Sequence, residues 1–175
     1  GAWDYKVDND NAEVQALGAN ETIDEVFTVT TTDDQDQAIT ITITGADDAS
    51  LISVTGSGES AIGGVTEETG VDGNNKISTS GTISVTDADT SHTAAFKTAP
   101  AEIVLKSTEA TSQLGTLTIN ASGAWSYSVD NTLGAIQALD TGESIVEVFT
   151  VSTTDGLDTQ DITITINGKD DDSQI

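Results

Sequence analysis

The sequence predicts an all-β fold, an antiparallel Greek-key β-sandwich that is repeated in tandem. Threonine, isoleucine and valine dominate the apolar-rich segments, and β-branched residues favour strands over helices. These segments alternate apolar and polar residues, so one face of each strand packs on a core while the other meets water. Breaks rich in Gly, Asp and Asn separate the segments at short intervals, as is typical of a sandwich.

Six or seven short strands are predicted in the complete repeat. In the fourth, Trp125, Tyr127 and Val129 share one face, and in the last, isoleucines alternate with threonines. Both tryptophans of the chain lie in such alternating segments, so we expect them to pack in cores rather than to bind sugars. The predicted strands lie at residues 82–87, 102–107, 115–120, 124–129, 146–153 and 160–167, and a turn or two of helix is expected at 133–139.

The chain repeats itself with a period of 122 to 123 residues. When residue 1 is aligned with residue 123, 21 of the first 36 positions are identical, and "EVFTV" occurs in both copies. After Asp36, which pairs with Asp158, the second copy gains one residue, and "ITITITGADD" then matches "ITITINGKDD". A period of this length predicts a string of globular modules, because solenoid repeats are only about 20–50 residues long.

Acidic segments mark the predicted module boundaries. "GADDAS" (45–50) and "GKDDDS" (168–173) each follow a strongly alternating strand and are typical of linkers. Residues 1–48 are therefore predicted to be the C-terminal part of one repeat, and residues 49–175 one complete repeat.

The partial repeat at 1–48 admits three explanations. It carries about three amphipathic strands, and without the front of its own sandwich it would expose an apolar face and strand edges. The chain can be a piece of a longer array, residues 1–48 can pack with 49–122, or strands of another chain can complete the module and build a fibre. We expect the first; a mass that depends on concentration would favour the third.

The charge balance excludes several classes of partner. Thirty acidic residues face five basic ones, for a formal charge of -25. Nucleic acid needs clustered Lys and Arg, and an anionic membrane surface would repel this chain, whereas cations are attracted. No apolar run approaches the ~18 residues of a membrane-spanning helix. Cysteine is absent, so neither disulfides nor thiolate metal sites are available.

Four motifs in order resemble a known family. They are "SGTISVTDAD" (80–89), "GTLTINASGAWSYSVDN" (115–131), "IQALDTGESIVEVFTVSTTDG" (136–156) and "ITITINGKDD" (162–171). Together they resemble the VCBS repeat, a cadherin-like, immunoglobulin-like β-sandwich found in tandem in large bacterial surface proteins, including RTX-type adhesins. The resemblance covers about 80–175 well and 1–48 as a back portion, whereas 49–79 fits loosely. The linker lacks the family's usual proline, and the glycine-rich RTX nonapeptide is absent.

The resemblance implies Ca2+ as a cofactor. In cadherin-like arrays, linker acids, an early-strand Glu and an Asp-x-Asp pair meet at the joints between modules. Ca2+ takes six to eight oxygen ligands, commonly carboxylates, although Asp-rich loops also form Asx turns without an ion. The candidate metal ligands are Asp47, Asp48, Asp87 and Asp89, followed by Glu67, Asp155 (with Asp158), Asp170 and Asp171 (with Asp172).

We expect no enzyme. His92 is the only histidine, and no "GxSxG" nucleophile motif accompanies it. The expected function is a structural extender or spacer module of an extracellular bacterial adhesin or surface fibre, located at the cell surface and stiffened by calcium. Its partners would be neighbouring repeats and other copies of the chain, with no nucleic acid and no membrane insertion. The alternatives are an adhesive module that binds a glycan or a partner cell, and a self-assembling filament subunit.

Overall fold

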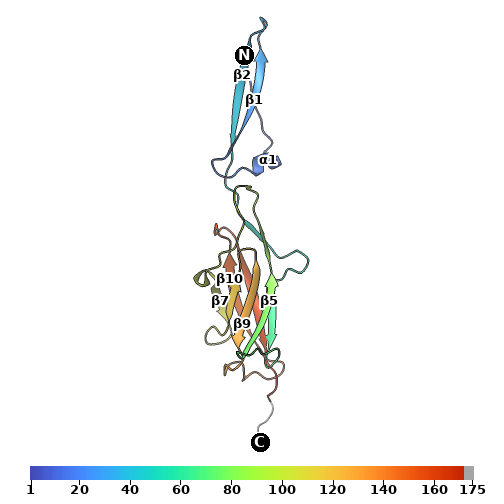
Figure 1. Cartoon of the computed structure of the whole chain (residues 1–175), viewed down its shortest axis with the longest axis vertical. Coiled ribbons are helices and arrows are strands. Elements are labelled where there is room, and N and C mark those ends of the chain that lie inside the picture. The colour runs from blue at the N-terminus through green and yellow to red at the C-terminus, as the bar shows by residue number, and fades with distance from the viewer. Residues whose placement is uncertain (172–175) are drawn as a thin grey trace. The chain divides into compact units, whose positions relative to one another are not determined.

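The computed structural model describes residues 1–171 and is almost entirely β, which confirms the predicted fold class. The Greek-key connectivity stays a prediction. The chain forms two compact units (Figure 1). The first comprises Gly1–Ala49 and the loop Asp87–Thr93, which sequence analysis placed in the following repeat. The second comprises Ser50–Thr86 and the chain from Ala94 onward. Within residues 1–171, no helix is long and apolar enough to span a bilayer.

The first unit is built on one long β-hairpin. Strands β1 (Thr22–Thr30) and β2 (Asp36–Thr44) pair antiparallel along their whole length (Figure 1). A single helical turn, α1 (Ala12–Gln15), precedes them, and Asn11 caps it by accepting a hydrogen bond from the Glu13 backbone N–H.

The expectation of a third strand in residues 1–48 is wrong, because residues 1–8 form no strand. The equivalent segment of the second copy is β9 (Ala124–Asp130), which pairs with two strands on its flanks. Those flanking strands, β5 and β8, lie in residues 50–122, and no described strand pairs with residues 1–8. A segment without neighbouring strands has no ladder to join, whatever its β propensity.

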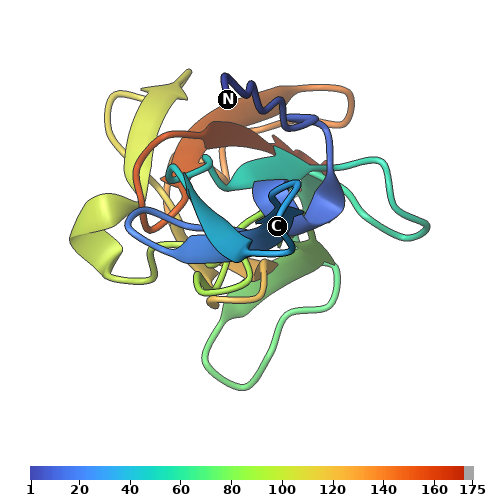
Figure 2. The same cartoon turned by 90° about the horizontal axis from the view of Figure 1, so that it is seen from above.

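The described part of the second unit contains nine strands: seven form two main sheets, and two form a short separate sheet. The four-stranded sheet has the order β4 (Ile62–Thr66), β11 (Thr159–Asn167), β10 (Ser144–Ser152) and β7 (Val104–Thr108). The three-stranded sheet has the order β5 (Lys76–Thr82), β9 and β8 (Thr116–Ile119). Strands β3 (Leu51–Ser53) and β6 (Ser84–Thr86) form the small sheet, and a 3-10 turn occupies Pro100–Glu102. In the four-stranded sheet β10 lies between β7 and β11 (Figure 2), and only the β4–β11 pair is parallel.

The inward faces of these sheets form one hydrophobic core. Trp125 and Tyr127 on β9 are 2% and 0% exposed, and Phe149 on β10 is 1% exposed. The Trp125 indole N–H donates to the Ser60 carbonyl over 2.8 Å, so the only polar atom of the ring is satisfied. Isoleucines of β11 complete the core, as the period-two alternation predicts.

Candidate functional site

An Asp-rich loop, Asp87–Thr93, carries the candidate site within the first unit. The Asp89 backbone N–H donates to Asp87 Oδ1 over 3.0 Å, which is an Asx turn. The next residue, Thr90, fixes the loop, because its N–H and its hydroxyl both donate to the Ala16 carbonyl at 3.2 and 3.1 Å.

The loop and the acidic linker bring three side chains together, which we call the linker site: Asp47, Asp89 and His92. The imidazole Nδ1 of His92 lies 2.9 Å from Asp47 Oδ1 and 3.6 Å from Asp89 Oδ2. The same Asp89 Oδ2 accepts the Asp48 backbone N–H over 2.7 Å, which ties the linker to the loop. One ligand atom from each of the three side chains lies within 4.8 Å of the others.

Asp89 is the unusual member of the linker site. The residue is 2% exposed, its side chain is fully buried, and its Oδ1 atom has no hydrogen-bond partner among the described residues. Burying a carboxylate oxygen without a partner costs free energy, so native structures rarely leave one unsatisfied. A cation beside Asp89 would satisfy it. By contrast, Asp47 and His92 are more than half exposed and leave the linker site open to solvent.

The donor set decides which ions fit. Two carboxylates suit a hard cation such as Ca2+, which also takes backbone carbonyls and water. An imidazole nitrogen suits Zn2+ or a similar transition metal instead. The oxygen atoms of Asp47 and Asp89 therefore fit calcium. His92 is not a calcium ligand, and its contact with Asp47 would have to break for that carboxylate to bind the ion.

Glu67, a predicted ligand, lies in the second unit and is 0% exposed. It accepts hydrogen bonds from the Gln137 side-chain amide (2.6 Å) and the Lys169 backbone N–H (3.3 Å). Burial raises the pKa of the Glu67 carboxyl, and the charges of Asp171 and Glu68 act in the same direction. Its hydrogen bonds join the end of β4 to two later segments of the same unit.

The carboxylates of Asp155 and Asp158 accept hydrogen bonds from backbone N–H groups of the second unit. Asp155 Oδ2 accepts the Ser50 N–H over 2.8 Å, and Asp158 Oδ2 accepts the Ile52 N–H over 2.8 Å. Asp155 Oδ1 also accepts the Leu157 N–H and the Thr153 hydroxyl. Hydrogen bonds to the charged form, led by that from Leu157, lower the pKa of Asp155 far below its usual value. These contacts secure the segment that contains β3.

The acids at the exit of the second unit are exposed. Asp170 Oδ1 accepts the Thr141 N–H over 2.9 Å, and the Thr141 hydroxyl accepts the Asp170 N–H over 3.1 Å. Asp171 is exposed as well, and Asp172 lies outside the described residues. In the alignment of the two copies, Asp170 and Asp171 are equivalent to Asp47 and Asp48.

The resemblance to cadherin-like arrays implies a group of Asp47, Asp48, Asp87 and Asp89, and in the structure the linker and the loop that carry them lie together. His92 was not expected in this group. The available signal was spacing, since His92 follows Asp89 by three residues in one tight loop, and its backbone N–H donates to the Asp89 carbonyl at 3.4 Å.

Comparison with known proteins gives no further guide: no protein-family model matches the chain, and no curated protein matches it significantly.

Proposed function

We propose that this chain is a structural extender from an extracellular bacterial surface protein of the VCBS type, and that Ca2+ bound at the linker site fixes its linker. The proposal combines the family resemblance of four motifs with the duplication of one module. The observation that carries it is that duplication: the hairpins β1–β2 and β10–β11 have the same nine-pair register, and an acidic linker follows each. Serial copies joined by linkers are what a spacer requires, and they add length without any catalytic group.

Calcium would be held by the carboxylates of Asp47 and Asp89. The unsatisfied buried Oδ1 of Asp89 supports this assignment. Asp48 and Asp87 would hold Asp89 in place. The Asp48 backbone N–H donates to the Asp89 carboxylate, and the Asp87 carboxylate accepts the Asp89 backbone N–H. An ion there would join the linker to the Asp87–Thr93 loop and offset carboxylate repulsion in a chain of charge -25.

Thermal melts with Ca2+ and with EDTA test the metal. At a free ion level about 100-fold above Kd, one site adds roughly 2.7 kcal/mol of stability, so we expect Ca2+ to raise the midpoint of the first unit's transition. Asp89→Asn should abolish this increase. Asp10→Asn is the matched control, because Asp10 is exposed and outside the linker site. A midpoint that is identical in Ca2+ and EDTA contradicts the proposal.

His92→Ala separates calcium from a transition metal. The imidazole is not an oxygen ligand, so we expect the variant to keep its Ca2+ response. If Zn2+ stabilises the parent chain and His92→Ala loses that response while Ca2+ does nothing, the linker site is a transition-metal site.

Small-angle scattering tests the extender role separately from the metal. We expect the distribution of interatomic distances to narrow when Ca2+ replaces EDTA, because a fixed linker removes conformers. An unchanged distribution in a chain that does bind Ca2+ would argue against stiffening.

A further inference from the structure

The β1–β2 hairpin of the first unit exposes an apolar face, whereas the equivalent face of the β10–β11 hairpin in the second unit is buried. Strands β1 and β2 repeat β10 and β11 pair for pair, yet the exposure of equivalent residues differs greatly. Phe27 is 47% exposed and its equivalent Phe149 only 1%; Val29 is 46% exposed and Val151 only 1%. The difference therefore lies in what covers the hairpin and not in the hairpin itself.

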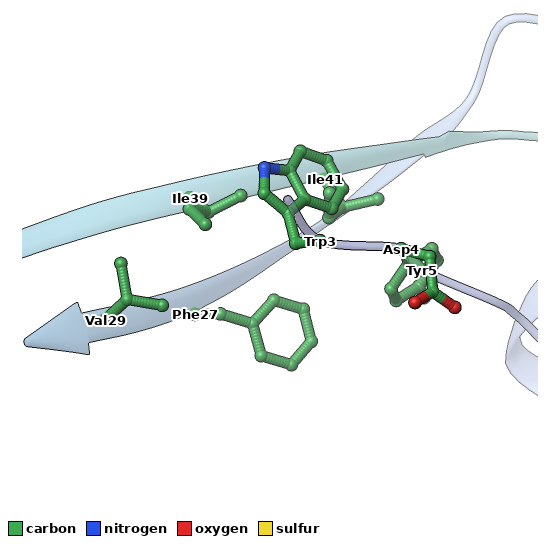
Figure 3. A pocket seen from close by; sticks show the side chains of 7 residues that line it. All are labelled: Trp3, Asp4, Tyr5, Phe27, Val29, Ile39 and Ile41. Carbon is green, nitrogen blue, oxygen red and sulfur yellow. The ribbon is translucent and has the colours of Figure 1, made fainter. Parts of the chain in front are cut away.

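The exposed residues line one open hollow of about 160 Å³ within the first unit (Figure 3). Trp3 is 61% exposed, whereas its equivalent Trp125 is 2% exposed. Contiguous exposed apolar surface is a common feature of interaction sites. The apolar residues that line the hollow are Trp3, Tyr5, Phe27, Val29, Ile39 and Ile41.

We propose that this face is a docking surface for the front segment of another repeat of the same kind. By front segment we mean a stretch equivalent to residues 50–122. The occupant is identified by the chain itself, because the second copy shows which strands cover the same hairpin. This proposal goes beyond the extender function and needs no metal.

The second copy also gives the register of docking. Strand β7 pairs antiparallel with β10, with Leu105 opposite Phe149. Strand β4 pairs parallel with β11, with Gly63 opposite Ile164. The equivalent edges of β1 and β2 belong to a sheet of two strands in the described chain. An incoming front segment would add an antiparallel strand beside β1 and a parallel strand beside β2.

The first unit already contains a hydrogen bond that the incoming front segment would extend. In the second unit, Glu147 accepts the Tyr127 hydroxyl and also the backbone N–H groups of Leu114 and Gly115, at 2.7 and 3.1 Å. The first unit keeps the equivalent of the first bond, since the Tyr5 hydroxyl donates to Glu25 Oε2 over 3.0 Å. The other two donors would come from the backbone of the front segment.

Glycines in the front segment make room for the aromatic rings. A Cβ on Gly81 would lie 2.5 Å from the Trp125 ring, and one on Gly115 would lie 2.1 Å from the Tyr127 ring. Any larger residue at these two positions would collide with the ring. The partner of Trp3 must therefore carry glycine at the position equivalent to Gly81.

A second copy of the chain does not supply this occupant by exchange. Residues 1–171 carry two back parts, 1–48 and 123–171, and one front segment, 50–122. If a neighbour lends its front segment to β1–β2, it uncovers its own β10–β11 and re-exposes an equal face. Exchange between two such chains therefore leaves the number of uncovered hairpins unchanged, and the proposed occupant is the front segment of a further repeat.

The test adds a separate polypeptide of residues 50–122 to the full chain and follows tryptophan fluorescence. The probe contains neither Trp nor Tyr, so the signal comes only from the full chain. Since Trp125 is already buried, any change reports Trp3. We expect a blue shift, loss of acrylamide quenching and a 1:1 complex by mass.

Matched probes give the specificity. Gly81→Val in the probe should abolish the response, because its side chain would occupy the place of the Trp3 ring. Gly73→Val should leave it intact, because nothing lies within 4 Å of a Cβ at Gly73. An equal response to both probes, or none to the unsubstituted soluble probe, overturns the proposal.

A covalent version keeps the test decisive if the probe aggregates. Residues 50–122 are placed directly before Gly1 of the full chain. Protection of Trp3 supports the proposal, and a Trp3 that stays as accessible to acrylamide as before overturns it. If Trp3 of the unextended chain becomes protected as concentration rises, with a doubled mass, the occupant is a second hairpin and the proposal is wrong.

Discussion

The buried hydroxyl of Tyr127 donates to the carboxylate of Glu147 over 2.7 Å. Both residues are 0% exposed, and Glu147 also accepts two backbone N–H groups from the segment before β8. Burial raises the pKa of the Tyr127 hydroxyl far above its usual value, and the Glu147 carboxylate adds to this effect. The hydroxyl therefore remains a donor, and the pair links the two main sheets of the second unit.

Glu147→Gln should destabilise the second unit. The amide keeps one acceptor oxygen but turns its NH2 group toward donors, so at least one buried N–H loses its partner. A loss of about 1–3 kcal/mol is expected, measured by urea unfolding. Glu102→Gln, an exposed position, is the matched control and should change nothing. Equal stability of the two variants would mean that the pair is not a structural link.

The twin phenylalanines allow the same substitution to be made in two environments. Phe149→Ala should cost about 3–5 kcal/mol, the usual loss for a buried aromatic residue. Phe27→Ala should leave the unfolding of the second unit unchanged, because Phe27 lies in the other unit and is 47% exposed. The fluorescence of Trp125 during denaturation reports the second unit. A similar loss of second-unit stability from Phe27→Ala would contradict the assignment of Phe27 to a separate unit.

Asp155 should make the second unit sensitive to acid. Hydrogen bonds lower the pKa of its carboxyl in the folded chain. A lowered folded pKa means that the stabilisation is fully present above the unfolded value, about 3.9, and is lost as the pH falls toward the folded value. In Asp155→Asn, the free energy of unfolding should therefore fall less steeply with decreasing pH below about pH 4. Urea midpoints measured between neutral pH and strong acid, with Asp10→Asn as the control, check this; parallel curves would contradict it.

Alternation along the strands made the back half of the repeat predictable. The isoleucines of β11 and the aromatic residues of β9 lie on the faces that the period-two pattern assigns. In the front segment, β6, β7 and β8 match predicted strands, but β3 and β4 lie before residue 82, where no strand was predicted. Strand β4 begins "IGG", and Gly63 is there because a Cβ would lie 2.8 Å from the Trp125 ring. Strand propensity cannot identify a strand that contains glycine because the side chain of a distant strand packs against it.

Identity of sequence also failed to guarantee identity of structure. Trp3 and Trp125 lie in nearly the same local sequence, but only one of them belongs to a strand. The strand depends on neighbours that are far away in the sequence. In the same way, Asp87 and Asp89 could be grouped with the linker acids from the sequence, whereas the contact of His92 with Asp47 depends on how one loop folds.

Amide hydrogen exchange in the two equivalent hairpins tests most directly whether β10–β11 are covered by other strands while β1–β2 are exposed. An isolated two-stranded sheet is only marginally stable in water, while β10–β11 are flanked by further strands on both sides. The account predicts rapid exchange of the β1–β2 amides beside strong protection of β10–β11, and slower exchange in β1–β2 once residues 50–122 are supplied. Equal protection of the two hairpins in the chain alone would contradict it.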